Sequence, residues 1–243
     1  MVLQWPHGIV FTSEWMRQHG FSRQLVDRYK KNRWLETVGR GAHRLANDLV
    51  DWTGAVYALQ KQLHLPIHPG GKTALQMRGL SHFVPPLIRE IFLFGPHDQK
   101  LPAWYKSYDW GVKHHYLMTR LFPTGLGVSE LDLGTFSIKV SSSERAVMEL
   151  LFLIPRKQTL NESSLIMEHL VSLRPSLVQT LLENCNSIKV KRLFLFLGEK
   201  YGHQWFHRLD PQKIDLGSGK LSLIPGGTFD SKYQITIPKE LNR

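Results

Sequence analysis

The segment 12–45 constrains the fold more than any other part of the chain, because two short helical patterns meet there at a glycine. Ser13 can cap the first helix and Ser22 the second, each by accepting a hydrogen bond from a free backbone N–H. Gly20 suits the turn between them, since glycine adopts a positive φ at little cost. Strand-like residues then flank Gly39-Arg40-Gly41. This order of elements predicts a winged helix-turn-helix.

The second helix of this segment has two chemically different faces. Leu25, Val26 and Tyr29 share one face, and the other carries charged and amide side chains at spacings of three and four. Arginine, glutamine and lysine suit base edges and phosphates in a major groove. We therefore expect a DNA-binding site on this helix and the hairpin, made of Ser22, Arg23, Gln24, Arg28, Lys31, Arg40, His43 and Arg44.

The charge of the segment supports a polyanionic partner. Between residues 17 and 44 there are eight Lys or Arg against two acids, a local balance of +6 out of the chain's +11. Such a concentration attracts nucleic acid and makes binding fall steeply with salt. The alternative is a small helical subdomain with a solvated basic face. The helix pair favours double-stranded DNA as the partner.

Length and composition set the remaining bounds. A chain of 243 residues predicts two domains, which we place at 1–48 and 49–243. Hydrophobic residues make up 42%, which is ample for a core. A single cysteine, Cys185, excludes an intramolecular disulfide and fits a reducing compartment. No signal peptide or membrane span is evident, so we expect a soluble, cytoplasmic protein.

The second domain shows strand patterns first and helical patterns later. A polar joint at 47–51 precedes a helix that Asp51 can cap, and residues 72–79 predict another short helix. Extended stretches are expected at 90–94, 114–122 and 134–140, and at 233–237 near the end. Four helical patterns follow Ser143, although periodicity leaves a buried strand open at 193–197. The fold class is therefore α+β, a winged helix-turn-helix followed by a larger mixed domain with a helical half.

Two motifs in the second domain imitate cofactor sites. Gly70-Gly71-Lys72-Thr73 resembles the end of a phosphate-binding loop, but Pro66 stands where the loop needs a glycine. His203 and His207 have a zinc-like spacing without a third ligand nearby, and Trp205 between them indicates packing. We expect no cofactor and no metal.

A nuclease-like site is the alternative function. Metal-dependent nucleases carry strand-borne acids followed by a lysine, as Glu130, Asp132 and Lys139 do here. Ser137 stands where the second acid is needed, and a hydroxyl cannot replace its charge at a hard cation. The chain is thus expected not to be an enzyme, with a degenerate or active nuclease-like domain as the competing hypothesis.

A basic stripe near residue 190 is the candidate for a second binding surface. Lys189, Lys191 and Arg192 lie in an otherwise apolar segment, and we expect them to be exposed. A solvated face is the alternative interpretation.

The chain as a whole resembles the antitoxins of AbiE-type (type IV) toxin–antitoxin systems, in the branch with an N-terminal winged helix. The resemblance rests on segments spread over nearly the full length: 19–25, 34–35 with 39–42, 54–60, 65–68 with 70–75, 93–96, 140–146, 173–175, 190–195 and 214–220. One departure is at the start, where only Met1 to Trp5 precede Pro6 in place of the family's full first helix.

The resemblance implies a regulator that represses its own operon by binding promoter DNA at inverted half-sites. It also implies a C-terminal domain that counteracts a nucleotidyltransferase-like toxin without a stable complex. Lys189, Lys191 and Arg192 are the expected residues of that antitoxin function.

Overall fold

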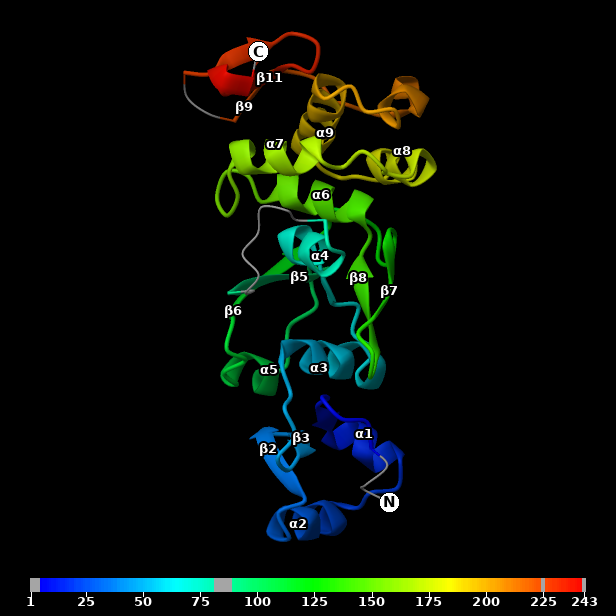
Figure 1. The fold of residues 1–243 in the computed structure, drawn as a ribbon, viewed down its shortest axis with the longest axis vertical. Coiled ribbons are helices and arrows are strands. Elements are labelled where there is room, and N and C mark those ends of the chain that lie inside the picture. Colours follow the sequence, from blue (N-terminus) through cyan, green and yellow to red (C-terminus); the bar gives the residue numbers. More distant parts are fainter. Residues whose placement is uncertain (1–4, 81–88, 224–225, 242–243) are drawn as a thin grey trace. The chain divides into compact units, whose positions relative to one another are not determined.

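The chain forms two compact units that bring together segments distant in sequence. The computed structural model describes residues 5–80, 89–223 and 226–241 (Figure 1). Within these residues, unit 1 comprises 5–69, 89–119 and 129–140, and unit 2 comprises 70–80, 120–128, 141–223 and 226–241. The boundary expected between residues 48 and 49 falls inside unit 1, and it stays a prediction about independent folding.

Unit 1 begins with the two helices and the hairpin expected from the sequence. The first elements are β1 (Phe11–Thr12), α1 (Ser13–Gln18), α2 (Arg23–Lys31), β2 (Leu35–Gly39) and β3 (Ala42–Leu45). Thr12, and not Ser13, caps α1 by accepting from the Trp15 amide at 3.2 Å. Ser22 caps α2 as predicted, accepting from the Leu25 amide at 3.2 Å. Of the segment 1–5, where the sequence suggested a shortened start, residues 1–4 lie outside the described part.

The three strands form an antiparallel sheet in the order β1-β3-β2 that backs the two helices. The core they share consists of Trp5, Ile9, Phe11, Met16, Phe21, Val26, Leu35 and Leu45. Tyr57 and Phe136, from later parts of unit 1, pack against this core. Gln62 is buried and holds β1 through two hydrogen bonds, from the Thr12 amide at 2.8 Å and to the Val10 carbonyl at 2.7 Å. The first 48 residues therefore share their interior with the rest of unit 1.

A second sheet in unit 1 has the order β4-β5-β6. Asp51 caps the preceding helix as predicted, by accepting from the Thr53 and Gly54 amides. The expected strand at 90–94 extends to Pro96, and the one expected at 114–122 ends at Thr119. The remaining elements of this part are α3 (Trp52–Tyr57), the π-helical turn η2 (Ala58–Gln62), β4 (His68–Pro69), β5 (Glu90–Pro96), α5 (Ala103–Ser107), β6 (Lys113–Thr119), β7 (Val128–Asp132) and β8 (Ser137–Ser141).

Unit 2 is helical, with α6 in contact with α4, α7, α8 and α9, and it ends in a small sheet of order β10-β11-β9. Residues 193–197, left open between helix and strand, lie in α9. Buried Glu149 joins α6 to its surroundings by accepting from the Gly71 amide, the Ser141 hydroxyl and Arg145 Nε. The elements are α4 (Gly71–Met77), α6 (Ser143–Phe152), α7 (Leu160–Glu168), α8 (Pro175–Glu183), α9 (Ile188–Lys200), η3 (Phe206–Arg208), η4 (Pro211–Lys213), β9 (Leu221–Ser222), β10 (Thr228–Asp230), β11 (Ile235–Ile237) and η5 (Lys239–Leu241).

The chain is a mixed α+β protein with several small sheets, as its patterns predict. Among the described residues, none of the helices combines the length and the apolar composition that crossing a bilayer requires.

Candidate nucleic-acid interface

Helix α2 presents the two faces that its sequence predicts. Val26 is buried, and Leu25 and Tyr29 pack against the core of the first sheet. On the opposite face the side chains are exposed: Arg23, Gln24, Arg28 and Lys31. Ser22, also exposed, uses its hydroxyl as the N-cap. The predicted base-reading side chains therefore project from one surface of a capped helix.

Two of the eight basic residues in this region are neutralised by acids. Lys30 Nζ lies 2.6 Å from Asp27 Oδ1, and this contact lowers the pKa of the Asp27 carboxyl. Arg44 donates to Glu36 Oε2 from Nε at 2.9 Å and from Nη2 at 2.7 Å. The other six form no salt bridge with any residue that the structure describes: Arg17, Arg23, Arg28, Lys31, Arg33 and Arg40.

The hairpin tip is held against α5. Gly41 has φ 84°, which the tight turn requires and glycine supplies. Gly39 touches Trp104 so closely that an added Cβ would lie 2.9 Å from the Trp104 Cβ. Arg40 remains exposed at the tip between these glycines. The hairpin is thus a fixed support for Arg40, because its turn rests on a packed aromatic side chain.

Of the last two predicted DNA contacts, His43 is buried and Arg44 is engaged by an acid. His43 is only 5% exposed, and its Nε2 lies 3.2 Å from Ser13 Oγ. Burial, and then the charge of nearby Lys30, lower the pKa of His43. Arg44 is partly buried and occupied by Glu36. The structure therefore places six of the eight predicted residues on the surface, buries His43 and leaves Arg44 partly exposed but paired with Glu36.

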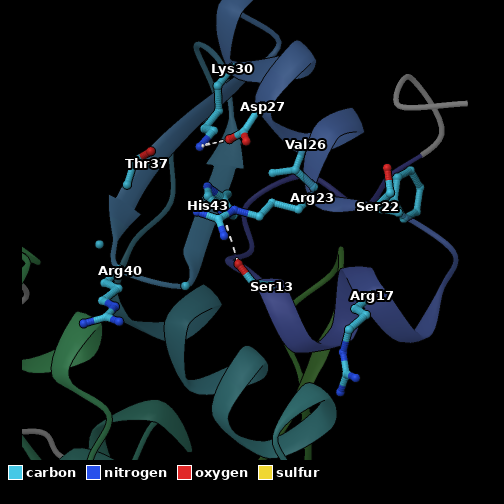
Figure 2. A pocket seen from close by; sticks show the side chains of 13 residues that line it. Ser13, Arg17, Ser22, Arg23, Val26, Asp27, Lys30, Thr37, Arg40 and His43 are labelled. Atoms are coloured by element: carbon cyan, nitrogen blue, oxygen red, sulfur yellow. Dashed lines mark hydrogen bonds and ion pairs between the residues drawn. The ribbon is translucent and has the colours of Figure 1, made fainter.

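A pocket of about 530 Å³ lies between α1, α2 and the hairpin (Figure 2). In this view Arg23 extends from α2 toward His43, while Arg17 and Arg40 point away from the centre of the pocket. Ser13, Thr37 and the Asp27–Lys30 pair also line it, and none of these was among the predicted site residues. The spacing of three between Asp27 and Lys30 is a sequence signal that could have shown their pairing.

The expectation of an exposed stripe at Lys189, Lys191 and Arg192 is wrong. Lys189 Nζ donates to the carbonyls of Phe152, at 2.8 Å, and Ile154, and burial lowers its pKa. Lys191 and Arg192 are 4% and 2% exposed.

The heads of the last two side chains turn toward the C-terminal segment. Lys191 donates to the Asp215 carbonyl at 2.9 Å. Arg192 donates to the carbonyls of Leu216, Gly219 and Gln234 at 2.8, 2.7 and 3.1 Å. These cations hold that segment against α9, and the carbonyls in turn satisfy the donors of two charged side chains that burial removes from water.

The motifs that imitate catalytic or metal sites have local partners instead. The Gly71 amide donates to Glu149, and Lys72 pairs with Glu162. His203 is buried, with Nε2 2.8 Å from the Met167 carbonyl. Glu130 pairs with Lys61 at 2.7 Å, and Asp132 accepts from the Gly134 amide. Within the described ranges, no group of three or more His, Cys, Asp or Glu side chains could hold a metal ion.

Comparisons with known proteins agree over most of the chain. A family model described as "Transcriptional regulator, AbiEi antitoxin, Type IV TA system" matches residues 89–238. A second, described as "Transcriptional regulator, AbiEi antitoxin N-terminal domain", matches residues 1–85. The crystal structure of the RV2827C protein from Mycobacterium tuberculosis is similar in fold, with a TM-score of 0.62 and 14% identity, over 93% of this chain and 85% of that chain. The search of curated proteins gave no match.

Proposed function

Since the chain belongs to the AbiEi antitoxins, the transcriptional regulators of type IV toxin–antitoxin systems, we propose that residues 1–48 form a winged helix-turn-helix that represses its own promoter. The exposed face of α2 carries this proposal. Three side chains with base-reading chemistry, Arg23, Gln24 and Arg28, project from it without an acidic partner among the described residues. A helix of this kind fits the major groove of duplex DNA.

The polar and basic side chains of this region fall into two groups, those that reach base edges and those that reach phosphates. Arg23, Gln24 and Arg28 contact base edges, while Lys31 at the helix end and Arg40 at the hairpin tip contact phosphates. Arg44 stabilises the hairpin through Glu36, because its guanidinium is already occupied. The operator holds inverted half-sites, each bound by one winged helix, so a footprint over a single unrepeated site would contradict this part.

Promoter binding by a double variant tests the assignment. We expect Arg23→Ala with Arg28→Ala to weaken binding to a fragment of its own promoter by about 100-fold or more, since each base contact contributes about 1–3 kcal/mol. Arg208→Ala is the matched control, because it removes an exposed arginine from unit 2. Normal binding by the double variant would show that α2 is not the reading helix.

For the rest of the chain we propose a non-enzymatic antitoxin module that counteracts a nucleotidyltransferase-like toxin. The support is the family match over 89–238, together with the engagement of Glu130 by Lys61 and of Asp132 by the Gly134 amide. Co-expression of residues 49–243 with the neighbouring toxin gene tests it, with growth as the readout. Rescue supports the proposal, whereas a soluble, folded fragment without rescue contradicts the division of labour. Mg²⁺-dependent cleavage lost on Asp132→Ala would contradict the non-enzymatic part.

A further inference from the structure

The pocket between α1, α2 and the hairpin contains a buried histidine with one nitrogen unused. His43 is 95% buried, and its Nδ1 has no hydrogen-bond partner among the described residues. Buried polar atoms are nearly always partnered, so an exception calls for an explanation such as a bound ion. His43 lines the pocket, and its other nitrogen contacts Ser13. The unpartnered nitrogen is itself covered by protein atoms, but it belongs to a side chain that lines a pocket which a ligand can enter.

The charges around this histidine favour an anion. Arg23 and Lys30 line the same pocket, Arg17 and Arg40 line it with their heads directed away from its centre, and the single acid, Asp27, is tied to Lys30. The volume of about 530 Å³ is in the range of sites for small ligands. Arginine and hydroxyl donors at the wall, with Arg23 directed toward His43, suit phosphate oxygens (Figure 2).

We propose that this pocket binds a phosphate group, which Ser13 and Lys30 contact next to the base-reading Arg23, and whose charge His43 balances by taking up a proton. The source is a backbone phosphate of the operator or a free phosphate compound. The first source deepens the proposed function and rests on it; the second does not depend on DNA binding.

Proton uptake by His43 makes the affinity for phosphate depend on pH in a definite direction. In the free protein, burial and Lys30 lower the pKa of His43, so the ring is neutral at pH 7. A phosphate dianion or diester next to the ring raises that pKa, which couples binding to protonation. Affinity therefore rises as the pH falls, by at most about tenfold per pH unit for one proton. Asp27, whose pKa the contact with Lys30 lowers, stays ionised through this range.

Two arms of one experiment separate the sources of phosphate. The first follows the His43 ring by NMR during titration with inorganic phosphate and pyrophosphate, without DNA, with His43→Gln for assignment. The second measures promoter binding from pH 5.5 to 8 at constant ionic strength. We expect wild type to bind the promoter about tenfold more tightly at pH 5.5 than at pH 8. The control His19→Gln, which replaces an exposed histidine of the same region, should show the same change, whereas the affinity of His43→Gln should change by less than about twofold.

The outcomes are distinct. A shift of the His43 pKa with phosphate, together with the loss of pH dependence in His43→Gln, assigns the pocket to the operator backbone. A shift with pyrophosphate while the promoter response is unaltered assigns it to a free phosphate compound. If neither phosphate, pyrophosphate nor duplex moves the His43 resonances of the wild-type protein, the proposal is overturned. If no promoter is bound at all, the proposed function fails, while the first arm still decides the pocket.

Discussion

The salt dependence of promoter binding follows from the count of unpaired cations. Six basic side chains of the N-terminal region have no acidic partner in the described structure: Arg17, Arg23, Arg28, Lys31, Arg33 and Arg40. If Arg23 and Arg28 contact bases, four remain for phosphates. The slope of log K against log salt is then about −3.6 for four contacts and about −5.4 for six, per winged helix. Doubling the salt concentration thus weakens binding by roughly 12-fold to 40-fold.

A pair of hairpin variants turns this count into a test. Arg40→Ala removes an unpaired cation and lowers the slope by about 0.9, whereas Arg44→Ala removes one already neutralised by Glu36 and leaves the slope within about 0.3 of wild type. Fluorescence anisotropy of a labelled promoter duplex, titrated at salt concentrations from about 50 to about 300 mM, measures the slopes of both variants. A wild-type slope shallower than about −2, or equal slopes for the two variants, refutes the reasoning.

Two further predictions concern unit 2. Arg192→Ala removes a buried side chain and leaves the carbonyls of Leu216, Gly219 and Gln234 without their charged donor, so the free energy of unfolding falls by about 3–5 kcal/mol in urea titrations. The exposed control Arg208→Ala changes it by less than about 0.5 kcal/mol, and an equal effect of the two variants would contradict this role of Arg192. Burial would raise the pKa of Glu144, but hydrogen bonds from Arg174 outweigh it and lower the pKa to about 2. This carboxyl thus stabilises the fold above its unfolded pKa, and up to about 3 kcal/mol is lost as the pH falls from about 4.5 to 2. Glu144→Gln should flatten this acid limb, and an unaltered limb would show that another group causes it.

Local structure was predictable from single residues in this chain. Ser22 and Asp51 cap the helices that their side chains indicate, and the glycines around Arg40 mark the hairpin. These features depend on hydrogen bonds and φ angles within a few residues. The exposed face of α2 was predictable for the same reason, because helical spacing alone decides which side chains share a face.

Burial by distant segments was not predictable from such patterns. Lys191 and Arg192 lie in an apolar run, where a charge suggests exposure, yet the segment 215–234 supplies carbonyls that accept from them. His43 looks like a hairpin surface residue until Ser13 is placed beside it. Contacts between 1–48 and the rest of unit 1, such as those of Gln62, likewise join residues about 50 positions apart.

The most direct test of the account is the effect of Gln24→Ala on sequence discrimination. Gln24 is exposed on α2 and carries no net charge, so its loss removes base contacts without altering the electrostatic attraction to DNA. The affinities of wild type and variant are measured on the operator and on a scrambled duplex of equal length at one salt concentration. We predict that the ratio of the two affinities falls by about 5-fold to 100-fold while scrambled binding stays within about twofold. An unchanged ratio, or an equal loss on both duplexes, would contradict the claim that this face of α2 reads the operator.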